Sequence, residues 1–204
     1  MKIIFSILSL FLCHSQQIDP IPLFPDGMAY GASVSTNYTL DVFWDHLCPY
    51  SASAFNGLFL YYYNTPWLRM VIHILPLPYH YYAFNVGAAG RYVQSNTPST
   101  FTQYLSYMFK NQNKYLTTAQ SWNQTTLFSN LANDTQTATG VDAGLVLASL
   151  KNGTDALNLR ISWKYAMSKG ITGTPTYMLN GVLVPQATSF TSVTDWENFF
   201  SSLN

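Results

Sequence analysis

The spacing of apolar residues changes along the chain, and each change predicts a different kind of element. Residues 38–44 (YTLDVFW) are rich in β-branched and aromatic side chains, which is typical of a strand. From Pro49 the apolar residues recur at i, i+3, i+4 and i+7, which predicts a helix that ends before Pro66. Residues 68–77 (LRMVIHILPL) are nearly all apolar, as expected for a strand buried on both faces. This part therefore predicts a β-α-β unit with parallel strands and a right-handed crossover.

A helical pattern occupies the middle of the chain, residues 79–168. Its clearest apolar stripe follows Pro98 and consists of Phe101, Tyr104, Leu105, Met108 and Phe109. Weaker helices are predicted near 80–94, 121–132, 141–151 and 155–168. Their predicted breaks lie at Asn133-Asp134, Thr139-Gly140 and Asn152-Gly153.

The pattern returns to strands near the C-terminus. Residues 176–179 and 182–185 flank Asn180-Gly181, which is the strongest short signal for a β-hairpin. The last helix is predicted to open with a capping box over residues 194–197 (TDWE). The predicted order is therefore β-α-β, a helical block, and β-β-α, which corresponds to an α/β thioredoxin fold with a helical domain inserted after its second strand.

Three motifs lie where these strands meet a turn or a helix: residues 45–51 (DHLCPYS), 75–80 (LPLPYH) and 170–181 (GITGTPTYMLNG). Over residues 38–203 the chain resembles the DsbA-like family of thiol-disulfide oxidoreductases. It also resembles their relatives, the kappa-class glutathione transferases and the 2-hydroxychromene-2-carboxylate isomerases. The resemblance implies a thioredoxin-like domain formed by 16–78 and 169–204, and an inserted helical domain at 79–168.

Cys48 is the candidate nucleophile, because a thiol attacks a disulfide only as the thiolate. Its place at the first turn of a helix should lower its pKa, since free backbone N–H groups and the helix dipole favour the anion. His46 is predicted to add positive charge when protonated, and Asp45 to oppose it. The alternative interpretation is an inert buried cysteine that packs as a small hydrophobic residue.

The resemblance implies roles for the residues around Cys48. Pro49 and Tyr50 set the loop and contact the substrate. Pro175 is cis and lies against the reactive sulfur, and the backbone of Thr174 pairs with an extended substrate. The alternative for Pro175 is a simple turn proline that starts a strand.

Ser51 is the main departure from a dithiol site, because it stands where a second cysteine resolves the mixed disulfide. A hydroxyl cannot do this, so release depends on an outside thiol such as glutathione, or on a second cysteine of the substrate. A second departure concerns the buried carboxylate that related enzymes place six residues before the nucleophile. That position is Val42 here, and Asp41 lies on the opposite face of the strand.

Two other functions remain open at this point. Residues 48–51 (CPYS) resemble the Ser-Pro-Tyr-Ser of kappa-class transferases, so a glutathione-dependent transferase or isomerase is one alternative. Such an enzyme needs groups for the carboxylates of glutathione, and the chain has only Arg69, Arg91 and Arg160 as arginines. The other alternative is a non-enzymatic peptide-binding or chaperone descendant of the fold.

The N-terminus has the layout of a secretory signal peptide over residues 1–15. Lys2 precedes the apolar run 3–13, which ends at a polar break. The run is shorter than the roughly 20 residues that a membrane span needs, so we expect no transmembrane segment; a buried N-terminal helix is the alternative. Cleavage removes Cys13, so the mature chain keeps Cys48 as its single thiol and can form no internal disulfide.

Four N-glycosylation triplets support the same route through the secretory pathway; their asparagines are Asn37, Asn123, Asn133 and Asn152. The location expected from these signals is the ER lumen or the extracellular space. The expected partners are cysteine-containing secretory proteins or peptides, with glutathione as a possible co-substrate and no other cofactor.

The net charge and the positions of the histidines bear on two further kinds of ligand, nucleic acid and metal ions. A formal net charge of zero gives no reason to expect nucleic acid as a partner. His73 and His80 have no further cysteine or acidic cluster near them in the sequence, so no metal site is predicted. The tyrosines at 61–63 and 79–82 are expected to pack in the core and between the domains.

Overall fold

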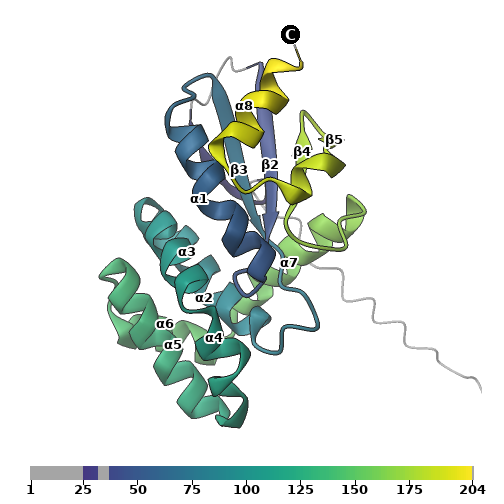
Figure 1. Ribbon diagram of the computed structural model, residues 1–204. Helices are drawn as coiled ribbons and strands as arrows, with labels where there is room; N and C mark the ends of the chain where they lie inside the picture. Colours follow the sequence, from purple (N-terminus) through teal and green to yellow (C-terminus); the bar gives the residue numbers. More distant parts are fainter. Residues whose placement is uncertain (1–24, 32–36, 204) are drawn as a thin grey trace, which may run out of the picture.

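A mixed five-stranded sheet forms the centre of the computed structural model, which describes residues 25–31 and 37–203 (Figure 1). The strand order is β1-β3-β2-β4-β5. These strands are Met28–Tyr30, Tyr38–Trp44, Leu68–Ile74, Thr176–Leu179 and Val182–Leu183 for β1 to β5. The pair β2–β3 is parallel, as the predicted β-α-β unit requires, and the other pairs are antiparallel.

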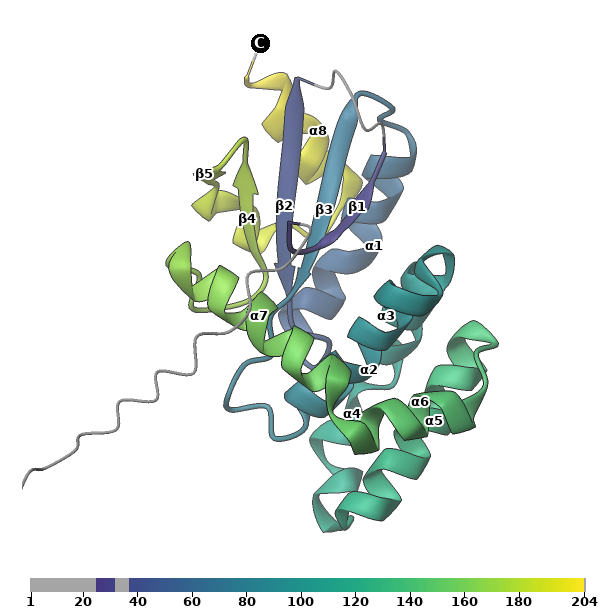
Figure 2. The same cartoon turned by 180° about the vertical axis from the view of Figure 1, so that it is seen from behind.

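Helices cover both faces of the sheet. On one face lie α1 (Pro49–Tyr63) and α8 (Val193–Ser201), whereas α7 (Thr154–Ser168) crosses the other face (Figures 1 and 2). Side chains of a strand alternate between faces. Val42 and Trp44 therefore join the main core with α1, and Phe43 packs in a second cluster on the side of α7.

The helical segment lies between β3 and β4, below the sheet in Figure 1. Besides α7 it contains α2 to α6: Ala83–Asn96, Phe101–Lys110, Gln112–Leu116, Gln124–Thr139 and Ala143–Asn152. Short 3₁₀ turns lie at Pro98–Thr100, at Thr118–Ser121 and, after β5, at Pro185–Ser189. The predicted fold class, a thioredoxin fold with a helical insertion, is confirmed.

Several predicted element bounds were wrong. The helix α5 continues through the predicted break at Asn133-Asp134, because the buried carboxylate of Asp134 accepts hydrogen bonds from side chains of α3 and α4. The capping box of α8 is formed by Ser192 and Asp195, two residues before the predicted one. The strand over 68–77 ends at Ile74, shortly before two prolines that cannot donate to a strand pair.

One strand and one exposure pattern were not anticipated. The three-residue strand β1 pairs antiparallel with β3 and forms an edge of the sheet. Tyr79 and Tyr81 were expected to pack between the domains, but both are exposed, and so is Tyr63. The second strand of the predicted hairpin is shorter than expected and ends at Leu183.

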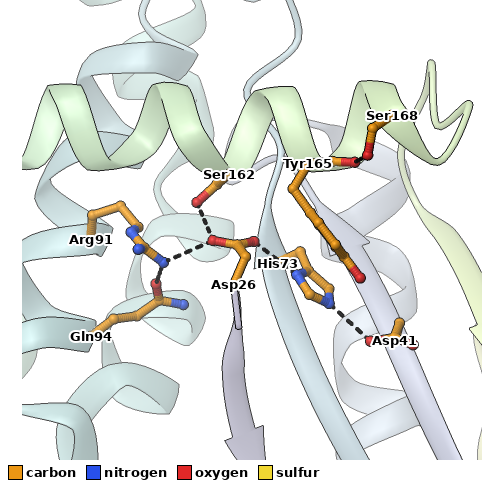
Figure 3. A network of polar contacts seen from close by, with 8 residues as sticks. All are labelled: Asp26, Asp41, His73, Arg91, Gln94, Ser162, Tyr165 and Ser168. Carbon is orange, nitrogen blue, oxygen red and sulfur yellow. Dashed lines mark hydrogen bonds and ion pairs between the residues drawn. The ribbon is translucent and has the colours of Figure 1, made fainter. Parts of the chain in front are cut away.

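A polar network ties the N-terminal strand to the rest of the fold (Figure 3). The ring of His73 on β3 lies between Asp26 and Asp41, at 2.9 and 3.0 Å. Asp26 also accepts a hydrogen bond from Ser162 on α7 and forms an ion pair with Arg91 on α2. Burial opposes protonation of His73, but the two carboxylates outweigh burial and raise the pKa of the imidazole. The network therefore has a structural role that the sequence pattern did not indicate.

Candidate active site

The loop that carries Cys48 is shaped by the short connection between β2 and α1. Cys48 is the N-cap residue of α1 and has extended backbone angles, and Pro49 follows at the first helical position. Proline suits that position because an N–H group in the first turn has no acceptor within the helix, so a residue without an N–H loses no hydrogen bond there. The backbone N–H of Cys48 donates to the carbonyl of Asp45 at 3.1 Å, which closes the loop into a tight turn.

Asp45 fastens this loop to the segment that follows β3. Its side chain is fully buried and accepts hydrogen bonds from the backbone N–H of Leu47 and of Leu77, at 2.8 and 2.9 Å. Nδ1 of His80 lies 2.7 Å from the same carboxylate. Asp45 and His80 thus join two of the three sequence motifs, a connection that the sequence analysis missed.

Cys48 and the Thr174–Pro175 turn meet, although they lie 126 residues apart in the sequence. Sγ of Cys48 donates to the carbonyl oxygen of Thr174 at 3.1 Å. The Thr174–Pro175 peptide bond is cis, so this prediction is confirmed. Cys48 is only 3% exposed, whereas Tyr50, two residues further on, is 75% exposed. Cys48 is therefore almost completely shielded from solvent, and an exposed aromatic side chain lies close to it in the sequence.

Ser51, which the sequence analysis predicted to stand in place of a resolving cysteine, lies in the first turn of α1. Its side chain is fully buried, and Oγ has no hydrogen-bond partner. The helical domain also holds the loop, because Nε2 of Gln112 donates to the carbonyls of His46 and Cys48, at 3.0 and 2.9 Å. Gln112 lies on the short helix α4, which the sequence analysis did not predict.

His46 does not supply the positive charge that was predicted for it. Its ring is buried against Phe101, Tyr104 and Phe109, and neither ring nitrogen has a hydrogen-bond partner. Burial lowers the pKa of His46 to about 4, against the weaker opposing effect of Asp45. The imidazole is therefore neutral at neutral pH, and the prediction that it promotes the thiolate of Cys48 was wrong.

His46→Leu should remove a pH-dependent loss of stability. As the pH falls from about 6.5 to about 4, His46 becomes protonated in the unfolded chain but stays neutral in the folded protein. The free energy of unfolding therefore decreases as the pH falls through this range. Between pH 8 and pH 5, the parent should lose about 2 kcal/mol relative to His46→Leu. Urea unfolding of both proteins at each pH measures the difference. An unfolding free-energy difference that is the same at both pH values would contradict the neutral, buried state of His46.

Two tyrosines, the exposed Tyr79 and the buried Tyr177, lie within electrostatic reach of Cys48. The pKa of Tyr79 is raised by burial first and then by the charges of Cys48 and Asp45. The pKa of Tyr177 is likewise raised by burial, with a smaller contribution from Cys48. The hydroxyl of Tyr177 accepts a hydrogen bond from Nε1 of Trp44 at 3.3 Å. Tyr177 follows Pro175 by two residues and lies on strand β4.

The position six residues before Cys48 lacks a carboxylate. Val42 is fully buried in the main core there, and Asp41 points to the other face of the sheet, where it contacts His73. A proton relay from Asp41 to Cys48 therefore has no support in these contacts.

The predicted glycosylation sites differ in their local structure, but all four asparagines are exposed: Asn37, Asn123, Asn133 and Asn152. Asn123 is the N-cap of α5, and Asn133 lies within that helix. The predicted signal peptide lies outside the described residues. Within residues 25–31 and 37–203, no helix is long and apolar enough to cross a membrane, and no three His, Cys, Asp or Glu residues gather as metal ligands would.

Comparison with known proteins extends the description of the fold. No family model matches the sequence, and no curated protein matches it. BdbD from Bacillus subtilis is a similar solved structure, with 15% identity, a TM-score of 0.68, and coverage of 86% of this chain and 91% of that one. MdbA, a thiol-disulfide oxidoreductase from Corynebacterium diphtheriae, has 17% identity, a TM-score of 0.63, and coverage of 80% and 86%.

The thiol-disulfide exchange protein alpha-DsbA2 from Wolbachia pipientis is also similar, with 12% identity and a TM-score of 0.63. The match covers 87% of each chain. At such identities, likeness of structure establishes a shared fold. The chain therefore has the architecture of DsbA-like proteins, a thioredoxin fold that carries a helical insertion.

Proposed function

We propose that this chain is a thiol-disulfide exchange or isomerisation protein of the secretory pathway, with Cys48 as its single nucleophile. The observation that carries the proposal is the 3.1 Å contact between Sγ of Cys48 and the carbonyl of Thr174, beside the cis bond to Pro175. Two proteins with the same fold, MdbA and alpha-DsbA2, are described as thiol-disulfide oxidoreductase and exchange proteins, which supports the same chemistry here.

The proposed reaction begins when the thiolate of Cys48 attacks one sulfur of a client disulfide. A bond forms between Sγ and that sulfur, and the client's other sulfur leaves as a thiolate. Backbone N–H groups of the first turn of α1 stabilise the attacking anion. A client chain held in extended form at Thr174 would present its disulfide to the sulfur.

Release of the client must use a thiol from outside the chain, because Ser51 cannot attack the mixed disulfide. Either a second client cysteine or a small thiol such as glutathione attacks the client's sulfur. This regenerates the thiolate of Cys48 and leaves a new disulfide on the client or between client and glutathione. A monothiol site therefore favours rearrangement of existing disulfides over net oxidation.

The proposed location is the ER lumen or the extracellular space, with glycans on the four predicted asparagines. The exposure of all four side chains supports this. A compartment that maintains disulfides also supplies clients for the reaction. Sequencing the mature N-terminus of the secreted chain checks the predicted cleavage after residue 15.

Reactivation of a scrambled disulfide-bonded protein tests the proposed function. In a glutathione redox buffer, the parent should accelerate recovery of the scrambled client, and Cys48→Ala should lose this acceleration, because no other thiol remains in the mature chain. The melting temperature of Cys48→Ala provides the folding control. Equal acceleration by parent and Cys48→Ala would instead identify a chaperone that acts by binding alone.

A further inference from the structure

We propose that a cavity at the opposite end of the sheet from Cys48 binds N-acetylglucosamine, the first sugar of a glycan on Asn37. The inference rests on the glycosylation that is part of the proposed function, and it goes beyond the thiol chemistry. Asn37 is itself one of the residues that line the cavity. The volume of the cavity is about 430 Å³, which is within the range of sites that hold small ligands.

The position of the cavity follows from the direction of the strands. Tyr38 is the first residue of β2 and Trp67 directly precedes β3, and these parallel strands begin at the same end of the sheet. The last turn of α8, which contributes Phe200 and Ser201, lies at that end as well (Figure 1). Cys48 follows the other end of β2, so a ligand in this cavity does not compete with a client at the sulfur.

Four aromatic side chains form the apolar part of the lining. Phe200 and Tyr61 are buried, and their rings stack with the centroids 5.4 Å apart. Tyr38 and Trp67 each pack edge to face with Phe200, at 5.8 and 5.2 Å, and Trp67 is 44% exposed. One face of a pyranose ring consists of C–H groups, which pack against aromatic rings and thereby leave water. An exposed tryptophan beside a half-buried tyrosine therefore suits a sugar.

Two polar side chains of α8 complete the lining. Glu197 and Ser201 are four residues apart, so they lie on the same face of the helix. Both are exposed, and no ion pair between described residues involves Glu197. The charge of Glu197 is close enough to Tyr61 to raise the pKa of that phenol, after the larger effect of burial. A carboxylate and a hydroxyl can hydrogen-bond the hydroxyl and amide groups of N-acetylglucosamine.

The backbone of the glycosylation triplet is fixed beside this lining. Asn180, in the turn between β4 and β5, donates from Nδ2 to the carbonyl of Asn37 at 2.9 Å. Its Oδ1 accepts from the backbone N–H of Thr39 at 2.8 Å. The side chain of Asn37 is exposed, and its amide has no hydrogen-bond partner among the described residues. The amide nitrogen can therefore carry a sugar without breaking a contact of the fold.

The attachment point distinguishes the chain's own glycan from other sources of the same sugar. A sugar linked to Asn37 is tethered to a lining residue, so its effective concentration at the cavity is of the millimolar order or higher. A glycan of another protein has no such tether. The chain's own first sugar therefore fills the cavity and covers Trp67.

Asn37→Gln removes the glycan and should lower the melting temperature by about 2–4 °C, as the loss of a few ring and hydrogen-bond contacts does in a domain of this length. The substitution keeps the backbone carbonyl that Asn180 bonds. Asn133→Gln is the matched control, because Asn133 is an exposed glycosylation site on α5 that does not line the cavity. This control should change the melting temperature far less.

A comparison of two tryptophan variants tests whether the glycan acts through the cavity. In Trp67→Ala, the additional change Asn37→Gln should lower the melting temperature little, because the sugar has already lost its ring contact. Trp163→Ala is the control, since Trp163 is 39% exposed on α7, outside this cavity, and should keep the full effect of Asn37→Gln. An equal effect of Asn37→Gln in the parent and in Trp67→Ala would overturn the inference.

Free N,N′-diacetylchitobiose distinguishes the two sources of the sugar. At millimolar concentration it should change the tryptophan fluorescence of Asn37→Gln, in which no glycan competes, but not that of the glycosylated parent. An equal response of both proteins would overturn the inference, because the cavity would then serve a glycan from another molecule.

Mass spectrometry of glycopeptides separates this inference from the proposed function. A glycan at Asn37 is expected. Glycans at the other three asparagines but not at Asn37 would overturn the inference and leave the secretory location standing, whereas glycans at none of the four would contradict both. The reaction of Cys48 enters none of these measurements, so a failure of the thiol chemistry is distinguished from a failure of this inference.

Discussion

Ser51→Cys should form an internal disulfide with Cys48 and should rearrange or oxidise clients without added glutathione. Ser51 is three residues after Cys48, one turn along α1 and on the same side of the helix. Its Oγ is buried and has no hydrogen-bond partner, so replacement by sulfur breaks no hydrogen bond of the described structure. A second sulfur held one turn away has an effective concentration of at least the millimolar order, so it should resolve mixed disulfides rapidly.

Mass spectrometry of alkylated protein before and after reduction measures the internal disulfide, and turnover of a disulfide-bonded peptide measures the gain of function. Ser53→Cys is the matched control, because Ser53 lies on the same helix but is exposed and its Oγ bonds Pro49. This control should form no internal disulfide. If Ser51→Cys stays reduced under mild oxidation while Cys48 remains reactive, the two positions do not form a dithiol site.

Asp45→Ala should have the largest effect on stability of the substitutions at this site. The substitution leaves the buried N–H groups of Leu47 and Leu77 without an acceptor and removes the partner of His80. An unsatisfied buried donor costs about 1–3 kcal/mol, so the free energy of unfolding should fall by about 3–5 kcal/mol. The Cys48 loop and the loop after β3 would lose their connection at the same time.

Urea unfolding of Asp45→Ala measures this loss. Asp142→Ala is a useful comparison, because Asp142 is an N-cap residue that accepts one hydrogen bond, from the N–H of Leu145. That variant should lose about 1 kcal/mol, as N-cap substitutions do. A loss for Asp45→Ala no larger than for Asp142→Ala would show that the buried carboxylate does not hold the two loops together.

Local sequence patterns predicted the elements whose signal is long or chemically specific. The stripe from Phe101 to Phe109 forms α3, and Asn180-Gly181 forms the turn between β4 and β5. Pro49 marked the start of α1. The strand β1 has only three residues and gains its place by pairing with β3, so no local pattern could indicate it.

The candidate site was predictable only in part, because several of its properties depend on burial. Cys48 and the Thr174–Pro175 turn were found from motifs that precede a helix and a strand, and Cys48 does contact Thr174 of that turn. The charge of His46 depends on aromatic residues of the helical domain, which its own neighbours in the sequence do not reveal. Gln112 reaches the Cys48 loop from α4, again a contact that only tertiary structure creates.

The three arginines illustrate the same limit for ligand recognition. From the sequence alone, the three are equivalent candidates for binding a carboxylate. In the structure Arg91 is held by Asp26, whereas Arg160 lines a cavity between α7 and the loop that follows β3. The position of α7 across the sheet decides this difference (Figure 2). Composition therefore supplied the candidates, and the packing of the helices decides which of them lies beside a cavity.

The most direct test of the central claim compares two rates. One is the rate at which Cys48 reacts with a peptide disulfide in the folded protein, and the other is the rate of the same reaction in the chain unfolded in urea. Mass spectrometry identifies the mixed disulfide at Cys48, and Cys48→Ala gives the background. A nucleophile placed at the start of α1 and beside Thr174 should react faster in the folded protein, despite its 3% exposure. Reaction only after unfolding would contradict the account, because Cys48 would then be an inert buried residue.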